Sequence, residues 1–210
     1  MDRTLEVRWF FEGPAPFTVR EWADALDLQH ESTRTDLYLV SKDGGMNVKL
    51  REERIQTKRR LDGPTPVSLT EDARGYREHW VKWSFPLVEG APDLHRDDPT
   101  GLWVPVHKER RQRTFTPDAD GLLFGASVEQ PMCAKVELTE AHVDTYEAYT
   151  LCVEAEGSED ELVDALQAAG AALLDAEETL GLVPNASFGY AKWLSTLVAQ
   201  REIEPGNVSA

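Results

Sequence analysis

Hydrophobic and polar residues alternate with a period of two in several separate segments of this chain. This spacing marks β-strands that have one face in apolar surroundings and the other in polar surroundings. The first such run covers residues 5–11, and others cover 47–53, 55–61, 80–85, 134–138 and 151–156. In each later run the residues opposite the apolar face include Lys, Arg or Glu, and the first run places Glu6 and Arg8 there. The pattern predicts a strand-rich domain in which many strands carry a charged face.

Helical signals occur in three places. Thr18 and Glu21 form a capping-box pattern ahead of apolar residues at helical spacing, which predicts a helix over about 18–28. Ser158 and Glu161 repeat this pattern ahead of a longer apolar stripe that ends near Gly181, and a last short helix is expected over 190–200. Separate runs of strands and helices are typical of an α+β domain.

The length of 210 residues fits one domain, which we expect over 1–202, with a flexible tail over 203–210. Apolar stretches are too short to span a bilayer, and no basic-then-apolar leader follows Met1, so we expect a cytoplasmic protein that does not bind membranes. Cys133 and Cys152 are too few for a disulfide framework, and both are expected as thiols. A monomer and a homodimer are both compatible with the sequence.

Charge is distributed unevenly along the chain. The net charge of −16 argues against bulk attraction to nucleic acid or anionic lipid. Residues 49–60 nevertheless contain six Lys or Arg against two Glu, and residues 107–113 contain four against one. An anionic ligand would therefore have to meet one of these local basic segments.

Two interpretations of the basic strand faces compete. A polar sheet face is usually just solvated, and its charges then do no chemistry. Solubility, however, favours interspersed signs, whereas these strands gather cations at positions of one parity. Phosphate suits such a cluster, because Arg donates paired hydrogen bonds to its oxygens and Lys supplies compact charge. The clustered cations are Lys49, Arg51, Lys58, Arg60 and Lys82.

Carboxylates accompany these cations on the predicted strands. Glu154 and Glu156 lie two residues apart, so both side chains are expected on one face. Oxygen ligands of this kind suit Mg²⁺ or Mn²⁺, which could bridge the carboxylates to phosphate oxygens. Glu-x-Glu pairs are also common on solvated surfaces, and that simpler interpretation stays open.

The order of these motifs along nearly the whole chain resembles the CYTH-like, or triphosphate tunnel metalloenzyme, superfamily. The motifs that carry the resemblance are Glu6-Val7-Arg8-Trp9-Phe10, Lys49-x-Arg51 followed by 58–60, the basic run 108–113, Lys135-Val136-Glu137, Glu154-Ala155-Glu156, and Asn185-x-Ser187 with Tyr190.

This resemblance implies an antiparallel, closed or nearly closed β-barrel of about eight strands with peripheral helices. It implies that a basic lumen binds a triphosphate, a polyphosphate or an organic phosphate, and that glutamates hold Mg²⁺ or Mn²⁺ for phosphoanhydride hydrolysis. The implied catalytic and metal-binding residues are Glu6, Glu154 and Glu156. The implied phosphate ligands are Lys49, Arg51, Lys58, Arg60, Lys82, Lys108, Arg110 and Lys135. By parity, either Lys108 and Arg110 or Arg111 and Arg113 face the lumen, but not both pairs.

The opening strand departs from the family pattern of Glu, Glu and Lys at alternating positions. Arg8 and Phe10 stand at the second and third of these positions, so a carboxylate and a phosphate-binding cation are lost. The departure supports an alternative function, a non-catalytic anion-binding, nucleotide-binding or sensor module with a degenerate metal site. A cavity adapted to a smaller anionic metabolite, and a scaffold whose inner charges only pair with each other, are further alternatives.

Overall fold

The computed structural model describes residues 2–87, 103–117, 123–125, 133–174 and 180–203. The strands are β1 Asp2–Glu12, β2 Gln29–His30, β3 Arg34–Leu39, β4 Met46–Arg51, β5 Arg54–Arg60, β6 Thr65–Ser68, β7 Arg74–Pro86, β8 Trp103–Pro117, β9 Leu123–Gly125, β10 Cys133–Val143 and β11 Tyr146–Glu156. The helices are α1 Phe17–Ala25, α2 Leu162–Leu174, the short 3₁₀ turn η1 Pro184–Ala186, and α3 Tyr190–Ile203. From residue 204 onward, the predicted tail lies outside the described residues.

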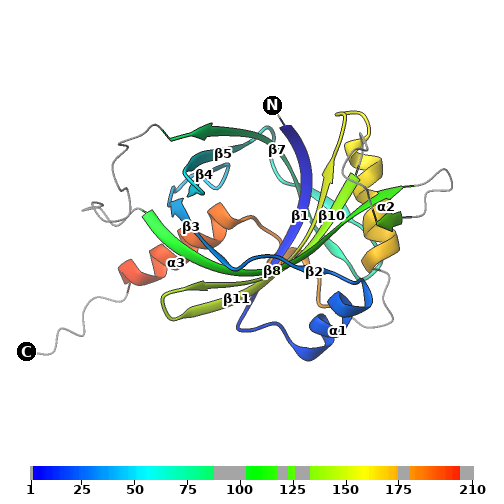
Figure 1. Cartoon of the computed structure of the whole chain (residues 1–210), viewed down its shortest axis with the longest axis horizontal. Coiled ribbons are helices and arrows are strands. Elements are labelled where there is room, and N and C mark those ends of the chain that lie inside the picture. The colour runs from blue at the N-terminus through cyan, green and yellow to red at the C-terminus, as the bar shows by residue number, and fades with distance from the viewer. Residues whose placement is uncertain (1, 88–102, 118–122, 126–132, 175–179, 204–210) are drawn as a thin grey trace, which may run out of the picture.

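Eight strands form a closed antiparallel barrel, as expected (Figure 1). Their order around the ring is β1, β11, β10, β8, β3, β4, β5 and β7, and β7 pairs with β1 to complete the circle. The short strands β6, β2 and β9 extend this sheet from β7 and β8. The fold class is therefore α+β, with a barrel that has an inside and an outside.

Strand register separates two kinds of side chain. In β1, Leu5, Val7 and Trp9 face outward and are buried under the helices α1 and α2 in a large apolar cluster. These helices lie against the same side of the barrel (Figure 1). The alternate β1 residues point into the lumen, where Glu6 is opposite Glu154 of β11. Because the pleat alternates, one register places the whole charged set inside.

The helix α3 closes one end of the barrel. Its apolar side chains, with Tyr190 and Trp193 among them, pack against the inward-facing residues Phe10, Tyr38 and Val106. Phe10 stacks on Trp193 at a centroid distance of 5.0 Å and meets the edge of Tyr190 at the same distance. The end formed by α3 is thus a packed floor, and no described segment packs across the opposite end of the lumen.

The segment before α3 is anchored to two strands. The backbone N–H of Phe188 donates to the carbonyl of Arg8 at 3.0 Å, and Ser187 forms an isolated bridge with Trp9. The Ser187 hydroxyl also accepts a hydrogen bond from the backbone N–H of Tyr76 at 2.8 Å. These contacts place Tyr190, the first residue of α3, at the bottom of the lumen.

Helix boundaries differ from the sequence expectation at α1. The helix begins at Phe17 with Pro16 as its N-cap, and no side chain caps it, so Thr18 and Glu21 do not form the predicted capping box. The helix ends two to three residues before the predicted end, because Asp27 adopts a positive φ of 53°. No helix in the described part of the chain has the length and apolarity needed to cross a membrane.

A candidate anion-binding lumen

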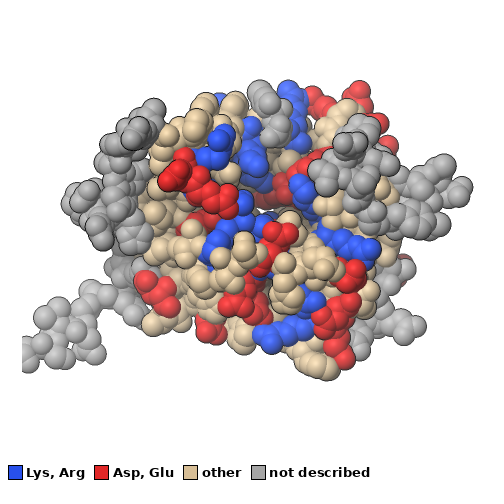
Figure 2. Space-filling view, viewed as in Figure 1, with Lys and Arg blue, Asp and Glu red and all other residues tan. Residues whose placement is uncertain are grey.

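The barrel encloses a cavity of about 720 Å³ that is lined by far more cations than anions. Among the described residues its lining has ten Lys or Arg side chains and five Glu side chains. On the face shown in Figure 2, blue Lys and Arg atoms surround a central hollow, with red carboxylates between them. The cations are Arg3, Arg8, Arg34, Lys49, Arg51, Lys58, Lys82, Lys108, Arg110 and Lys135, and the anions are Glu6, Glu31, Glu137, Glu154 and Glu156.

Three cations share one carboxylate near the floor of the lumen. Asp36 of β3 is fully buried, and Arg34, Lys49 and Lys108 approach its oxygens at 3.1, 3.1 and 3.2 Å. We call these four residues the Asp36 cluster. Its formal charge is +2 when both lysines are protonated. Such an excess in a buried position is unfavourable unless another anion compensates it.

The pKa values in the Asp36 cluster reflect this excess. Burial alone would raise the pKa of Asp36, but Lys108, Lys49 and Arg34 hold it well below its usual range. Burial, reinforced by Arg34, lowers the pKa of Lys49 to about 8 despite the attraction of Asp36. Burial and the adjacent Lys49 also lower the pKa of Lys108 well below its ordinary value. A nearby anion would stabilise the protonated form of both lysines.

Two tyrosines support Lys108 from below. Its ammonium donates a 2.6 Å hydrogen bond to the Tyr38 hydroxyl and lies 3.8 Å from the ring centroid of Tyr190. Burial raises the pKa of both phenols, so they stay neutral and cannot serve as counter-ions. The aromatic floor therefore orients Lys108 by hydrogen bonding and cation–π attraction without cancelling its charge.

Glu137 links two arginines at mid-depth. Arg8 and Arg110 donate to its two oxygens at 2.9 and 3.0 Å. Burial would raise the pKa of Glu137, yet these arginines and Lys108 hold it well below the usual range. Arg8 thus points into the lumen and contributes charge there. Sequence reasoning did not assign it a role.

The wall formed by β1 and β11 is close to neutral because each of its glutamates pairs with a lysine. The Lys58 ammonium lies 3.2 Å from an oxygen of Glu6 and 2.9 Å from an oxygen of Glu154. Burial would lower the pKa of Lys58, but Glu154 and Glu6 outweigh it and raise that pKa. Lys135 pairs with Glu156 in the same way at the open end. The surplus positive charge therefore lies on the β3, β4 and β8 side.

Most predicted site residues reach the lumen. All the implied ligands line it except Arg60, which shares the parity of Lys58 but lies deeper and donates to Glu78 at 2.6 Å. Burial and the neighbouring Glu6 raise the pKa of Glu78. Lys108 and Arg110 are the pair of β8 that faces inward.

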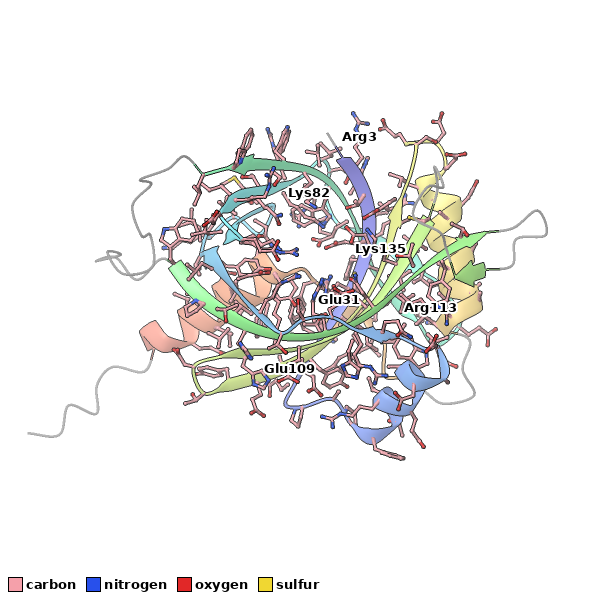
Figure 3. The ribbon with its side chains drawn as sticks, in the orientation of Figure 1. Arg3, Glu31, Lys82, Glu109, Arg113 and Lys135 are labelled. Atoms are coloured by element: carbon pink, nitrogen blue, oxygen red, sulfur yellow. The ribbon has the colours of Figure 1, made fainter. Side chains whose placement is uncertain are left out.

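The alternate β8 arginines face outward. Arg111 pairs with Asp24 of α1, and Arg113 pairs with Asp27 at 3.3 Å. Figure 3 shows Arg113 beside α1, whereas Glu31, Lys82 and Lys135 lie around the opening and Arg3 lies at the outer edge of the barrel, where it pairs with Glu159. The described residues provide no ion-pair partner for Lys82, which leaves one free cation at this rim.

Sequence reasoning missed Arg34, Asp36 and Tyr38, which all line or support the lumen from β3. Residues 34–39 do alternate, with Leu37 and Leu39 opposite these three. That short alternation could have predicted a strand with Arg34, Asp36 and Tyr38 on its inward face.

The predicted metal ligands do not present an oxygen cage to a divalent ion. Glu6 and Glu154 direct oxygens at the Lys58 nitrogen, and Glu156 directs one at Lys135. Within the described residues, no group of three or more His, Cys, Asp or Glu side chains is arranged to hold a metal ion. These residues, as they lie, do not fit Mg²⁺ or Mn²⁺, whose ligands are oxygens rather than ammonium groups.

The two cysteines are free and differ in accessibility. Burial raises the pKa of the Cys152 thiol well above its usual value, and burial with the adjacent Glu156 also raises the pKa of Cys133. Cys133 is only partly buried, whereas Cys152 is buried. We expect a thiol reagent such as DTNB to modify Cys133 before Cys152 in the folded protein and both in urea, because Cys133 is the more accessible thiol. Equal rates for the two thiols in native buffer would contradict this placement.

Comparisons with known proteins return structural neighbours but no sequence family. No protein-family model matches the chain, and no curated protein matches it. The PH1819 protein from Pyrococcus horikoshii OT3 is similar with a TM-score of 0.47 and 13% identity, over 94% of this chain and 99% of that one. The S. pombe Pct1 RNA triphosphatase, solved with the Spt5 CTD, is similar with a TM-score of 0.37 and 12% identity, over 96% of this chain and 83% of that one.

Proposed function

We propose that this chain binds a small phosphorylated anion, a triphosphate, a polyphosphate or an organic phosphate, in the lumen of its barrel. The observation that carries the proposal is the Asp36 cluster, in which buried Lys108 and the partly buried Arg34 and Lys49 share one carboxylate. A fold that binds nothing would be expected to neutralise such a cluster internally, as the wall of Glu6, Lys58 and Glu154 does. An anion bound at the floor would compensate the excess positive charge of the Asp36 cluster.

The chemistry of the lumen favours phosphate over a single carboxylate ligand. Guanidinium groups of Arg8, Arg34 and Arg110 can donate paired hydrogen bonds to phosphate oxygens, and Lys49 and Lys108 add point charges. The cavity volume of about 720 Å³ lies within the range of small-molecule and nucleotide sites. Because the cations extend from the floor to Lys82 at the rim, an extended polyphosphate would meet cations along its length.

Hydrolysis of a phosphoanhydride with Mg²⁺ or Mn²⁺ remains a prediction from the family resemblance. It would require Glu6, Glu154 and Glu156 to exchange their lysine partners for a metal ion. The non-catalytic module is the alternative, and the bridging position of Lys58 is the observation that favours it. We therefore propose anion binding as the function and keep hydrolysis as a prediction.

Thermal unfolding tests the proposal directly. We expect tripolyphosphate to raise the melting temperature by about 5–10 °C at a concentration of 100 times Kd, since ligand bound only to the native state stabilises by mass action. Pyrophosphate, ATP and thiamine triphosphate should be compared, each with and without Mg²⁺ or Mn²⁺. Phosphate release from every stabilising compound then separates a hydrolase from a binding module.

A pair of variants from one strand provides the control. Arg110→Met removes a lumen cation but leaves Glu137 paired with Arg8, whereas Arg113→Met removes an outward arginine. Only Arg110→Met should reduce the ligand-induced shift. The proposal fails if no phosphate compound raises the melting temperature, or if both variants reduce the shift equally.

A further inference from the structure

Lys58 occupies an unusual position for a lumen cation. It comes from β5, which β7 separates from β1, yet its ammonium lies between carboxylates of β1 and β11. The distances of 3.2 Å to Glu6 and 2.9 Å to Glu154 are those of charge-assisted hydrogen bonds. One lysine therefore bridges two glutamates that come from distant parts of the chain.

These two glutamates are largely buried and lie opposite each other in the register of β1 and β11. Two buried carboxylates at such a position require a cation, because their mutual repulsion is poorly screened there. Lys58 supplies it from within the chain. An ammonium has three hydrogen-bond donors, so it can satisfy both oxygens and keep one donor for a ligand in the lumen.

Additional cations surround this bridge. Arg8 lies on β1 two residues after Glu6, is buried, and points into the same lumen. Lys135 is paired in register with Glu154 across β10 and β11 and lies at the open end. A divalent ion entering here would have to displace Lys58, since Arg8 and Lys135 are themselves paired with Glu137 and Glu156. The arrangement favours the resident lysine over a metal ion.

We infer that Lys58 takes the place of a divalent cation between Glu6 and Glu154, so that the lumen captures phosphate anions in their metal-free form. This inference rests on the proposed function and names the form of ligand that the site accepts. A metal-free polyphosphate keeps its full negative charge for the cations of the Asp36 cluster, whereas a Mg²⁺ complex brings a competing cation with it. Mg²⁺ should therefore oppose binding.

Isothermal titration with tripolyphosphate tests this consequence. The affinity should be highest in EDTA and should fall about tenfold or more when the ligand is premixed with excess Mg²⁺, at constant ionic strength. Equal or tighter binding with Mg²⁺ would overturn the inference while leaving the proposed function intact. Absence of binding in both arms would instead overturn the proposed function, and the inference with it.

A direct metal titration needs no ligand. Manganese binding to the wild-type protein, followed by electron paramagnetic resonance, should show no site occupied at micromolar Mn²⁺. Occupancy of a micromolar site that Glu6→Gln removes would overturn the inference.

Replacement of Lys58 should expose the carboxylate pair. We expect Lys58→Met to gain Mn²⁺ binding, seen as a Mn²⁺-dependent rise in melting temperature that the wild type lacks. Lys135→Met is the matched control, because it removes a lysine from the adjacent pair with Glu156 but leaves the Lys58 bridge intact. A folded Lys58→Met protein that ignores Mn²⁺ would contradict the inference. If that variant does not fold, the wild-type manganese titration decides the question.

Discussion

Asp36→Asn should destabilise the ligand-free protein by about 3–5 kcal/mol, the usual cost of removing one partner from a buried charge network. Asp36 is the carboxylate that Arg34, Lys49 and Lys108 share, and it is fully buried. An amide in its place leaves three cations facing one another with no counter-ion. Urea unfolding, at pH 7 and low phosphate, measures the change in the free energy of unfolding.

An outer ion pair provides the comparison. Asp24→Asn removes the carboxylate that pairs with Arg111 on the exposed surface of α1, and a change below about 1 kcal/mol is expected there. Tripolyphosphate should stabilise Asp36→Asn more than it stabilises the wild type, because the ligand replaces the lost negative charge. If Asp36→Asn and the wild type unfold at the same midpoint concentration of urea, the Asp36 cluster does not hold the excess of positive charge that we describe.

Lys49→Met should weaken tripolyphosphate binding by about 10- to 100-fold, since a hydrogen bond to a charged group contributes about 1.5–3 kcal/mol. The same change should stabilise the ligand-free protein by up to about 3 kcal/mol at pH 7, because each unit of pKa depression corresponds to about 1.36 kcal/mol. The pKa of Lys49 is lowered from 10.5 to about 8 in the folded state. Binding and folding are thus expected to change in opposite directions.

The dependence on pH distinguishes this explanation from simple repacking. Between about pH 8 and pH 10.5, Lys49 binds fewer protons in the folded protein than in the unfolded chain, so wild-type stability should gain from rising pH in this window. Methionine cannot titrate, and the advantage of Lys49→Met should therefore shrink from pH 8 to pH 10. An advantage that stays constant over this range would attribute the effect to packing rather than to charge.

The inward face of most strands could be predicted from the sequence because it depends only on local alternation. Residues such as Glu6, Lys49 and Glu154 needed no knowledge of their neighbours to be assigned to a charged face. Parity, however, gives the face of a residue and not its depth. Arg60 has the predicted parity but lies beside Glu78 and Trp80 rather than along the cavity lining.

Partners within the lumen could not be predicted, because they depend on the register of strands far apart in the chain. Lys58 is separated from Glu6 by 52 positions and from Glu154 by 96. Without those contacts, a carboxylate pair and a basic strand indicate a metal site and a phosphate site side by side. In the structure the basic strand supplies Lys58 to the carboxylate pair, so these glutamates bind a lysine in place of a metal ion.

The hairpin of β4 and β5 was expected, but the position of its turn was not. The sequence suggested a strand through residue 53, but β4 ends at Arg51, and Glu52 and Glu53 form a two-residue turn with φ values of 48° and 57°. Hairpin turns with two positive φ values usually carry Gly, Asn or Asp, so a Glu-Glu turn has no local signature. Arg51 pairs with Arg54 directly across this turn.

In the part of the chain that the structure describes, the packed floor under Tyr38 and Tyr190 makes the lumen a blind tube that opens at the end where Lys82 and Lys135 lie. A linear ligand must enter by one terminus and leave by backing out through the same opening. We therefore expect discrimination by the ends of a molecule: compounds with a free terminal phosphate can reach the Asp36 cluster, whereas those carrying a bulky group at both ends cannot.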